Sequence, residues 1–123
     1  MNNARQTGAV LEAHFQFMQW LFPAIARFPR SQKLLLTDRI QTTALDILDS
    51  LVEATYTREK RAHLTRANLG IEKLRFLFRL AVELRYIDTK RYEHAARTMD
   101  DVGRQVGGWL KFERQERGGE AAR

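Results

Sequence analysis

Apolar residues in an alternating three–four spacing fill the second half of the chain and limit the folds open to it. Two segments carry six such residues each. They are Leu64, Ala67, Ile71, Leu74, Phe78 and Ala81, and then Tyr92, Ala95, Met99, Val102, Val106 and Trp109. This spacing is typical of long helices that pack lengthwise against one another, so it predicts a helical bundle.

Helical spacing continues through the rest of the chain, which shows no period-two alternation of strands. Helices are predicted over about residues 10–25, 32–55, 58–85 and 89–116, with a frayed tail at 118–123. Ser31 is the predicted N-cap of the second helix, and Asp88–Thr89 cap the fourth. The 123 residues therefore predict one domain, 1–123, folded as an all-α, antiparallel, up-down four-helix bundle.

Two predicted helices differ in how their apolar side chains are distributed. The first is expected to place Phe15, Met18, Phe22 and Ile25 on one side. The third is apolar around most of its circumference, which one bundle face does not require. Burial against another copy of the chain would cover the excess, so we predict a homo-oligomer. The predicted interface residues are Phe76, Leu77, Leu80 and Leu84.

The residues that would support catalysis or metal binding are missing from the sequence. It has no cysteine, and no Glu is followed three residues later by His, as in di-iron bundles. His14, His63 and His94 fall on different predicted helices and are expected at surface or boundary positions. We therefore predict no enzyme activity, no metal and no cofactor. No apolar run is long enough to cross a bilayer and no apolar signal core begins the chain, so a cytoplasmic protein without membrane contact is expected.

The positive charge lies in the second half of the chain. Residues 1–56 hold five Lys/Arg and five Asp/Glu, whereas residues 57–123 hold sixteen and ten. Four of these cations recur every seven residues, at the heptad position opposite the apolar residues: Lys90, Arg97, Arg104 and Lys111. Such a stripe suits sequence-independent contact with phosphates, although solubility alone also explains it. Arg91, Arg114 and Arg117 add charge nearby, and Arg91 and Arg114 join the predicted nucleic-acid-binding residues.

Other polar patterns are interpreted as structural. The third helix carries Glu72–Arg75 and Arg79–Glu83 at ion-pair spacing. The second helix carries an acidic line, Asp46, Asp49 and Glu53, which is expected to be structural and could meet Arg75 or Arg79. Gly103 and Gly107 suggest a close approach to the fourth helix, either within the chain or between chains.

Three stretches resemble a known family. They are Phe22-Pro23-Ala24-Ile25-Ala26-Arg27-Phe28-Pro29-Arg30, Leu74-Arg75-Phe76-Leu77-Phe78-Arg79 and Val102-Gly103-Arg104-Gln105-Val106-Gly107-Gly108-Trp109. In this order they resemble the accessory variability determinant (Avd) proteins of diversity-generating retroelements, over about residues 15–117. The resemblance implies a four-helix bundle that forms a basic homopentameric barrel. It also implies binding to the retroelement reverse transcriptase and to RNA or DNA, and a non-catalytic role in mutagenic cDNA synthesis.

Two other functions remain open at this point. Proteins encoded in intervening sequences of ribosomal RNA share the bundle, which makes a stand-alone RNA-binding bundle the alternative. That branch tends to carry an Asn-Ile-Ala-Glu-Gly stretch in its second helix, where this chain has Thr43-Ala44-Leu45-Asp46-Ile47-Leu48-Asp49-Ser50. The difference favours the retroelement branch. A structural oligomer without any nucleic-acid partner is the third possibility.

Overall fold

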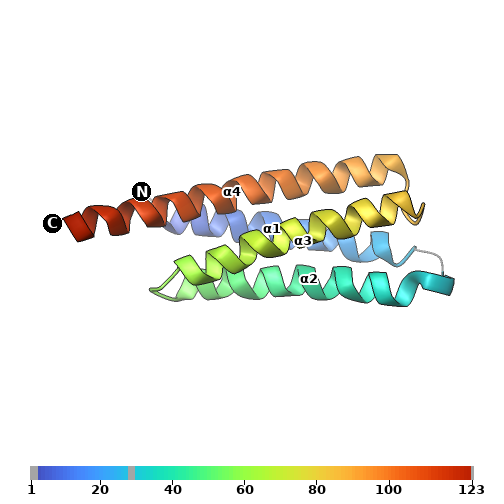
Figure 1. Cartoon of the computed structure of the whole chain (residues 1–123), viewed down its shortest axis with the longest axis horizontal. Helices are drawn as coiled ribbons and strands as arrows, with labels where there is room; N and C mark the ends of the chain where they lie inside the picture. The colour runs from blue at the N-terminus through green and yellow to red at the C-terminus, as the bar shows by residue number, and fades with distance from the viewer. Residues whose placement is uncertain (1–2, 28–29, 123) are drawn as a thin grey trace.

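The fold is a bundle of four antiparallel helices, α1 (Asn3–Ile25), α2 (Arg30–Tyr56), α3 (Arg61–Glu83) and α4 (Thr89–Ala122) (Figure 1). The computed structural model describes residues 3–27 and 30–122, with side chains for residues 8–27 and 34–116. Helices α1 and α3 each pack against both α2 and α4, so α2 and α4 lie diagonally opposite. The described residues contain no strand, which confirms the predicted all-α class. None of their helices is long and apolar enough to cross a membrane.

The three–four spacing marks the core of the bundle. All six residues predicted for α3 are buried. In α4, Ala95, Met99, Val102, Val106 and Trp109 are buried while Tyr92 is half-buried. Large side chains of the other helices complete the core, among them Phe17, Leu21, Ile25, Ile40, Ile47 and Leu51. The apolar stripe of each helix thus meets those of its two neighbours, as bundle packing requires.

The buried face of α1 differs from the predicted one at two positions. Phe15 is 48% exposed, whereas His14 beside it is buried. The buried stripe of α1 centres on Phe17 and Leu21, and Phe15 lies about 120° around the helix from Leu21. The Nε2–H of His14 donates to the carbonyl oxygen of Ala44 on α2 at 2.9 Å, which satisfies the polar atom that burial removes from water.

The connection between α2 and α3 is built around Lys60. Its Nζ donates to the carbonyl oxygens of Ala54 and Thr57, at 2.7 and 2.8 Å, and lies 5.9 Å from the centre of the Trp109 ring on α4. Lys60 therefore satisfies carbonyls at the end of α2. The predicted start of α3 near Arg58 is wrong. Residues 57–60 form the connection after α2, and α3 begins at Arg61.

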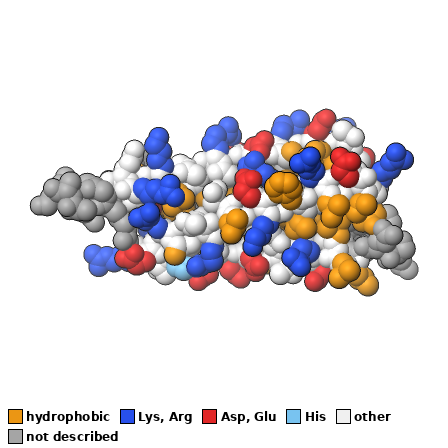
Figure 2. All heavy atoms as spheres, in the orientation of Figure 1, with side chains coloured by type: hydrophobic (Ala, Val, Ile, Leu, Met, Phe, Trp, Pro, Cys, Tyr) orange, Lys and Arg blue, Asp and Glu red, His pale blue; other side chains and the backbone are white. Residues whose placement is uncertain are grey.

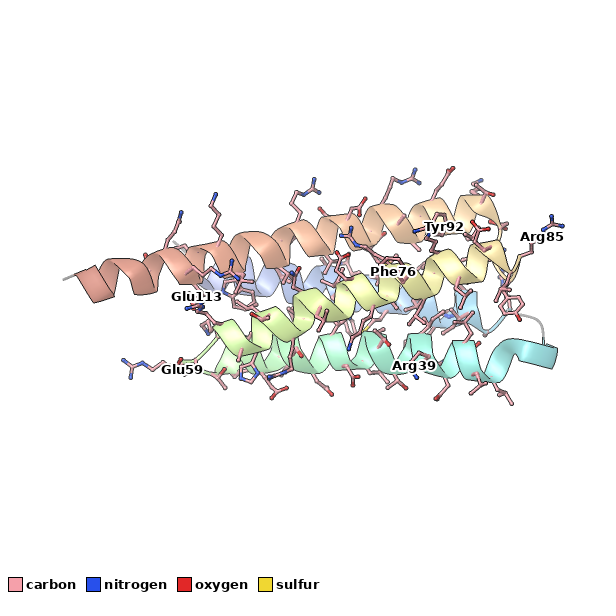
Figure 3. The ribbon with its side chains drawn as sticks, in the orientation of Figure 1. Arg39, Glu59, Phe76, Arg85, Tyr92 and Glu113 are labelled. Carbon is pink, nitrogen blue, oxygen red and sulfur yellow. The ribbon has the colours of Figure 1, made fainter. Side chains whose placement is uncertain are left out.

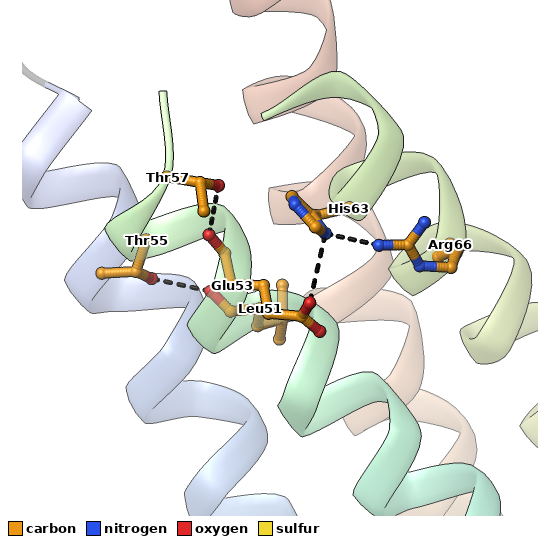
Figure 4. Close-up of polar contacts among 6 residues, drawn as sticks. All are labelled: Leu51, Glu53, Thr55, Thr57, His63 and Arg66. Atoms are coloured by element: carbon orange, nitrogen blue, oxygen red, sulfur yellow. Dashed lines mark hydrogen bonds and ion pairs between the residues drawn. The ribbon is translucent and has the colours of Figure 1, made fainter. Parts of the chain in front are cut away.

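Side chains also join the two helices across this connection (Figure 4). The Thr57 hydroxyl donates to the carbonyl oxygen of Glu53, and the Glu53 carboxylate lies 3.8 Å from Nδ1 of His63. His63 in turn contacts the guanidinium of Arg66. The half-buried His63 thus lies between a carboxylate of α2 and a cation of its own helix.

The connection between α3 and α4 ends one helix and caps the next. The N–H of Tyr86 donates to the oxygen of Ala81 at 2.9 Å and that of Arg85 to the oxygen of Val82 at 3.0 Å, which is a Schellman ending. Arg85 takes a φ of 61° in this motif, and α3 therefore ends at Glu83 instead of near Arg85. Oδ1 of Asp88 accepts the N–H of Arg91 at 2.8 Å, which confirms the predicted cap of α4.

Three helix ends lie beyond their predicted positions. α1 begins at Asn3 instead of near Val10, and α4 continues to Ala122 through most of the segment predicted to fray. α2 begins at Arg30, one residue before the predicted cap Ser31, whose side chain lies outside the described residues. Extending an existing helix adds a hydrogen bond for each residue fixed, so weak formers such as glycine at its end do not stop it.

Candidate nucleic-acid interface

Four cations form the predicted stripe on the outer side of α4. Lys90, Arg97, Arg104 and Lys111 are all exposed, and Figure 3 shows nitrogen-tipped side chains projecting from that side along the helix. The stripe faces away from the core because Ala95, Met99, Val102 and Val106 occupy the opposite side. We call these four residues the α4 stripe.

The cations of α4 differ in their local partners. Nη2 of Arg104 lies 2.7 Å from Oδ1 of Asp101, and Nη1 of Arg91 lies 2.9 Å from Oδ2 of Asp88. Among the described residues, Lys90, Arg97 and Lys111 form no ion pair. Arg114 is exposed but follows the buried Glu113, so it lies on the flank of the stripe. Exposed pairs contribute little stability, which leaves Arg104 able to exchange Asp101 for a phosphate.

The positive charge of the α4 stripe comes from where the cations lie on the helix, because the net charge of α4 as a whole is close to zero. It holds seven Lys/Arg and six Asp/Glu, whereas α3 holds five and two. Arg79 of α3 was not among the predicted binding residues, yet it is exposed and lines a groove of about 200 Å³ with Phe76 and Tyr92. Arg79 therefore adds an exposed cation of α3 beside α4.

The predicted ion pairs of α3 are only half present. Arg75 pairs with Glu72 at 3.5 Å, whereas Arg79 and Glu83, both described, do not pair. The guanidinium of Arg79 lies over the ring of Phe76 instead, 6.0 Å from its centre. A guanidinium is attracted to the face of an aromatic ring, and this contact competes with an ion pair to an exposed carboxylate.

Arg75 also joins α3 to α4. Its Nη1 lies 3.1 Å from Oδ1 of Asp100, so it does not reach the acidic line of α2. Its Nη2 lies 2.7 Å from the position of a Cβ at Gly103, whereas nothing lies within 4 Å of such an atom at Gly107. Within the chain, the close approach at Gly103 is to Arg75.

The acidic line of α2 borders a groove between α2 and α3. Asp46, Asp49 and Glu53 line it together with Arg66 and Lys73 of α3, in a volume of about 540 Å³. Gly70 allows the two helices to approach closely here, because a Cβ on it would lie 2.7 Å from Cγ1 of Ile47. The walls carry both charge signs, so this groove suits phosphates less well than the α4 stripe does.

The three histidines lie in different surroundings. The expectation of a surface or boundary position is wrong for His14, where burial lowers the pKa and the hydrogen bond to Ala44 offsets part of that effect. His63 is half-buried and His94 is exposed. Within the described ranges, no three His, Asp or Glu side chains come together as metal ligands.

The predicted self-association residues form a second apolar stripe on the outer side of α3. Phe76, Leu80 and Leu84 are 64%, 47% and 46% exposed, and Leu77 is half-buried against the core. Four-residue spacing aligns the exposed three along one side of the helix. Figure 2 shows exposed apolar side chains gathered toward the end of the bundle that holds the α3–α4 connection.

Comparison with known proteins identifies the family. The family model described as bAvd-like matches residues 9–113, which spans parts of all four helices and includes the α4 stripe and the exposed residues of α3. Among curated proteins, no significant match is found. With a match over most of its length and a helical bundle as its fold, the chain belongs to the bAvd-like family.

Proposed function

We propose that the protein is a non-catalytic accessory subunit of a diversity-generating retroelement. It binds the retroelement reverse transcriptase and holds RNA or DNA on the α4 stripe, and so supports mutagenic cDNA synthesis in the cytoplasm. The family match over residues 9–113 carries the proposal. The exposed cations of α4 support its nucleic-acid part, because neutralising phosphates needs accessible charge and no particular base sequence.

Self-association is part of the proposal. Burying Phe76, Leu80 and Leu84 between copies removes an apolar stripe from water, which favours association. In the proposed homopentamer, five chains of net charge +6 together carry +30. Several α4 stripes then contact one strand, and linked contacts bind more tightly than one stripe alone.

Coexpression with the reverse transcriptase of the same retroelement tests the proposal. A tagged chain should copurify the polymerase at 0.15 M salt and increase cDNA synthesis from the template RNA. Arg97→Glu/Lys111→Glu serves as the matched variant, and it should still copurify the polymerase while supporting less cDNA. RNA binding without any polymerase association would instead favour the stand-alone RNA-binding bundle. Absence of both interactions would leave a structural oligomer.

A further inference from the structure

An aromatic pair lies beside the α4 stripe, where α4 packs against α1. The rings of Trp20 and His94 have centres 4.6 Å apart and planes inclined by 51°. Trp20 is partly buried against the core, and its ring is nearly parallel to that of Phe17, with centres 6.1 Å apart. His94 is exposed. The pair therefore has an inner ring anchored to the core and an outer ring in contact with solvent.

Cations of the stripe flank this pair along α4. Lys90 precedes His94 by four residues and Arg97 follows it by three, so all three side chains share one side of the helix. Lys90 and Arg97 are exposed and are separated by about 10 Å along the helix axis.

Two carboxylates close to these cations along the helix are already engaged by other side chains. Asp101 accepts hydrogen bonds from Arg104 and Gln105, at 2.7 and 3.0 Å. Asp88 pairs with Arg91. Glu93 lies three residues after Lys90 and four before Arg97, at ion-pair spacing to both, yet among the described residues it pairs with neither. The ring of His94 is thus bordered by two cations on its own side of α4.

We propose that this site binds single-stranded nucleic acid, with a base stacked on the His94–Trp20 pair and the adjoining phosphates on Lys90 and Arg97. The inference rests on the proposed function and specifies its ligand. Aromatic side chains stack on unpaired bases of any sequence, and nearby cations follow the phosphates of the strand. The bases of a duplex already stack on one another, so a duplex gains only the phosphate contacts.

Intrinsic fluorescence provides the first test, because the two tryptophans of the chain differ in position. Trp109 is 1% exposed, whereas Trp20 is at the proposed site. An oligothymidylate of about twenty nucleotides, long enough to span a site of this kind, should quench the wild-type protein. The Trp20→Leu variant, which keeps an apolar contact with Phe17, should lose most of this quenching. Quenching of equal size in that variant would place the bases elsewhere.

Binding affinity provides the second test and does not require replacing a core residue. His94→Ala should weaken oligothymidylate binding about fivefold or more, the effect of removing one stacked base, and should leave duplex binding unchanged. Tyr56→Ala is the matched control, because Tyr56 is an aromatic residue of α2 that is 81% exposed. It should bind both probes as the wild type does.

The outcomes separate this inference from the proposed function. Equal affinity of the wild type for single strand and duplex, with no effect of His94→Ala, would overturn the stacking site and leave the α4 stripe as the interface. Failure of the wild type to bind either probe, or oligouridylate RNA, at low salt would overturn both.

Discussion

Arg75 fills the space that a side chain at position 103 would need. Its Nη2 lies 2.7 Å from the position of a Cβ on Gly103, while its Nη1 pairs with Asp100. The Gly103–Arg75 contact brings the polar edges of α3 and α4 together next to the stripe. An alanine at position 103 would displace only the tip of the flexible Arg75 side chain, which can move aside. At Gly70 the added Cβ would instead meet Ile47, which is buried in the core.

Alanine substitutions at two helical glycines should have opposite effects on stability. Gly107 has open space at its Cβ position, so Gly107→Ala should raise the free energy of unfolding by about 0.5–1 kcal/mol through helix propensity. Gly70→Ala should lower it, because the added Cβ would lie 2.7 Å from the buried Ile47. Urea unfolding monitored by circular dichroism measures both. Destabilisation by Gly107→Ala would indicate that another chain packs against this glycine.

The bundle was predictable because its core obeys a local rule, whereas the contacts at its edges join residues far apart in sequence. The three–four spacing of α3 is visible in the sequence, and all of those residues are buried. The buried position of His14 depends on the carbonyl of Ala44, thirty residues away. Likewise, Lys60 ends α2 and meets Trp109 on α4, and neither spacing nor composition reveals that contact.

The candidate site likewise has features that the sequence predicts and one that only the packing of the helices reveals. Seven-residue spacing was enough to predict the exposed side of α4, including Arg97 and Lys111. Pairing of Arg104 with Asp101 is a local contact that its i,i+3 spacing allows. The pairing of Trp20 with His94 follows only once α1 and α4 lie side by side.

Stability should fall in mild acid because of His14. Its pKa is lowered by burial, so below the ordinary value of about 6.5 the unfolded chain binds a proton that the folded chain does not. The free energy of unfolding should therefore decrease as pH falls from about 6.5 toward the lowered pKa, by at most about 1.4 kcal/mol per pH unit. His14→Gln retains an N–H donor for Ala44, and it should flatten this decrease. Identical pH profiles for the two proteins would contradict the assignment.

Glycine in place of Arg85 should stabilise the protein. Arg85 takes a φ of 61°, a conformation that glycine adopts without the Cβ clash. Figure 3 shows its side chain projecting away from the bundle. We expect Arg85→Gly to raise the free energy of unfolding by about 1 kcal/mol, measured by thermal and urea unfolding. Arg85→Ala keeps the clash and should give no comparable gain, so equal gains would show that the backbone conformation is not the cause.

Self-association should depend on the exposed stripe of α3. Light scattering at micromolar concentration should find the wild type as an oligomer, and Phe76→Ser/Leu80→Ser should reduce its mass toward that of the 14.4 kDa monomer without loss of helicity. The paired control is Leu45→Ser/Val52→Ser, which removes exposed apolar residues from α2. A monomeric wild type would contradict self-association, and dissociation only by the α2 variant would place the interface on α2.

The salt dependence of nucleic-acid binding by two charge-reversed variants tests the central claim most directly. Arg97→Glu/Lys111→Glu alters the α4 stripe, whereas Arg39→Glu/Lys73→Glu makes the same change of net charge at the α2–α3 groove. If the stripe holds phosphates, the first variant binds RNA and DNA more weakly. The magnitude of its slope of log affinity against log salt falls by about 0.7–0.9 for each phosphate that the variant no longer neutralises. The second variant should keep a slope close to that of the wild type. Equal reductions of affinity and slope in both variants would contradict the account, because net charge alone would then explain the binding.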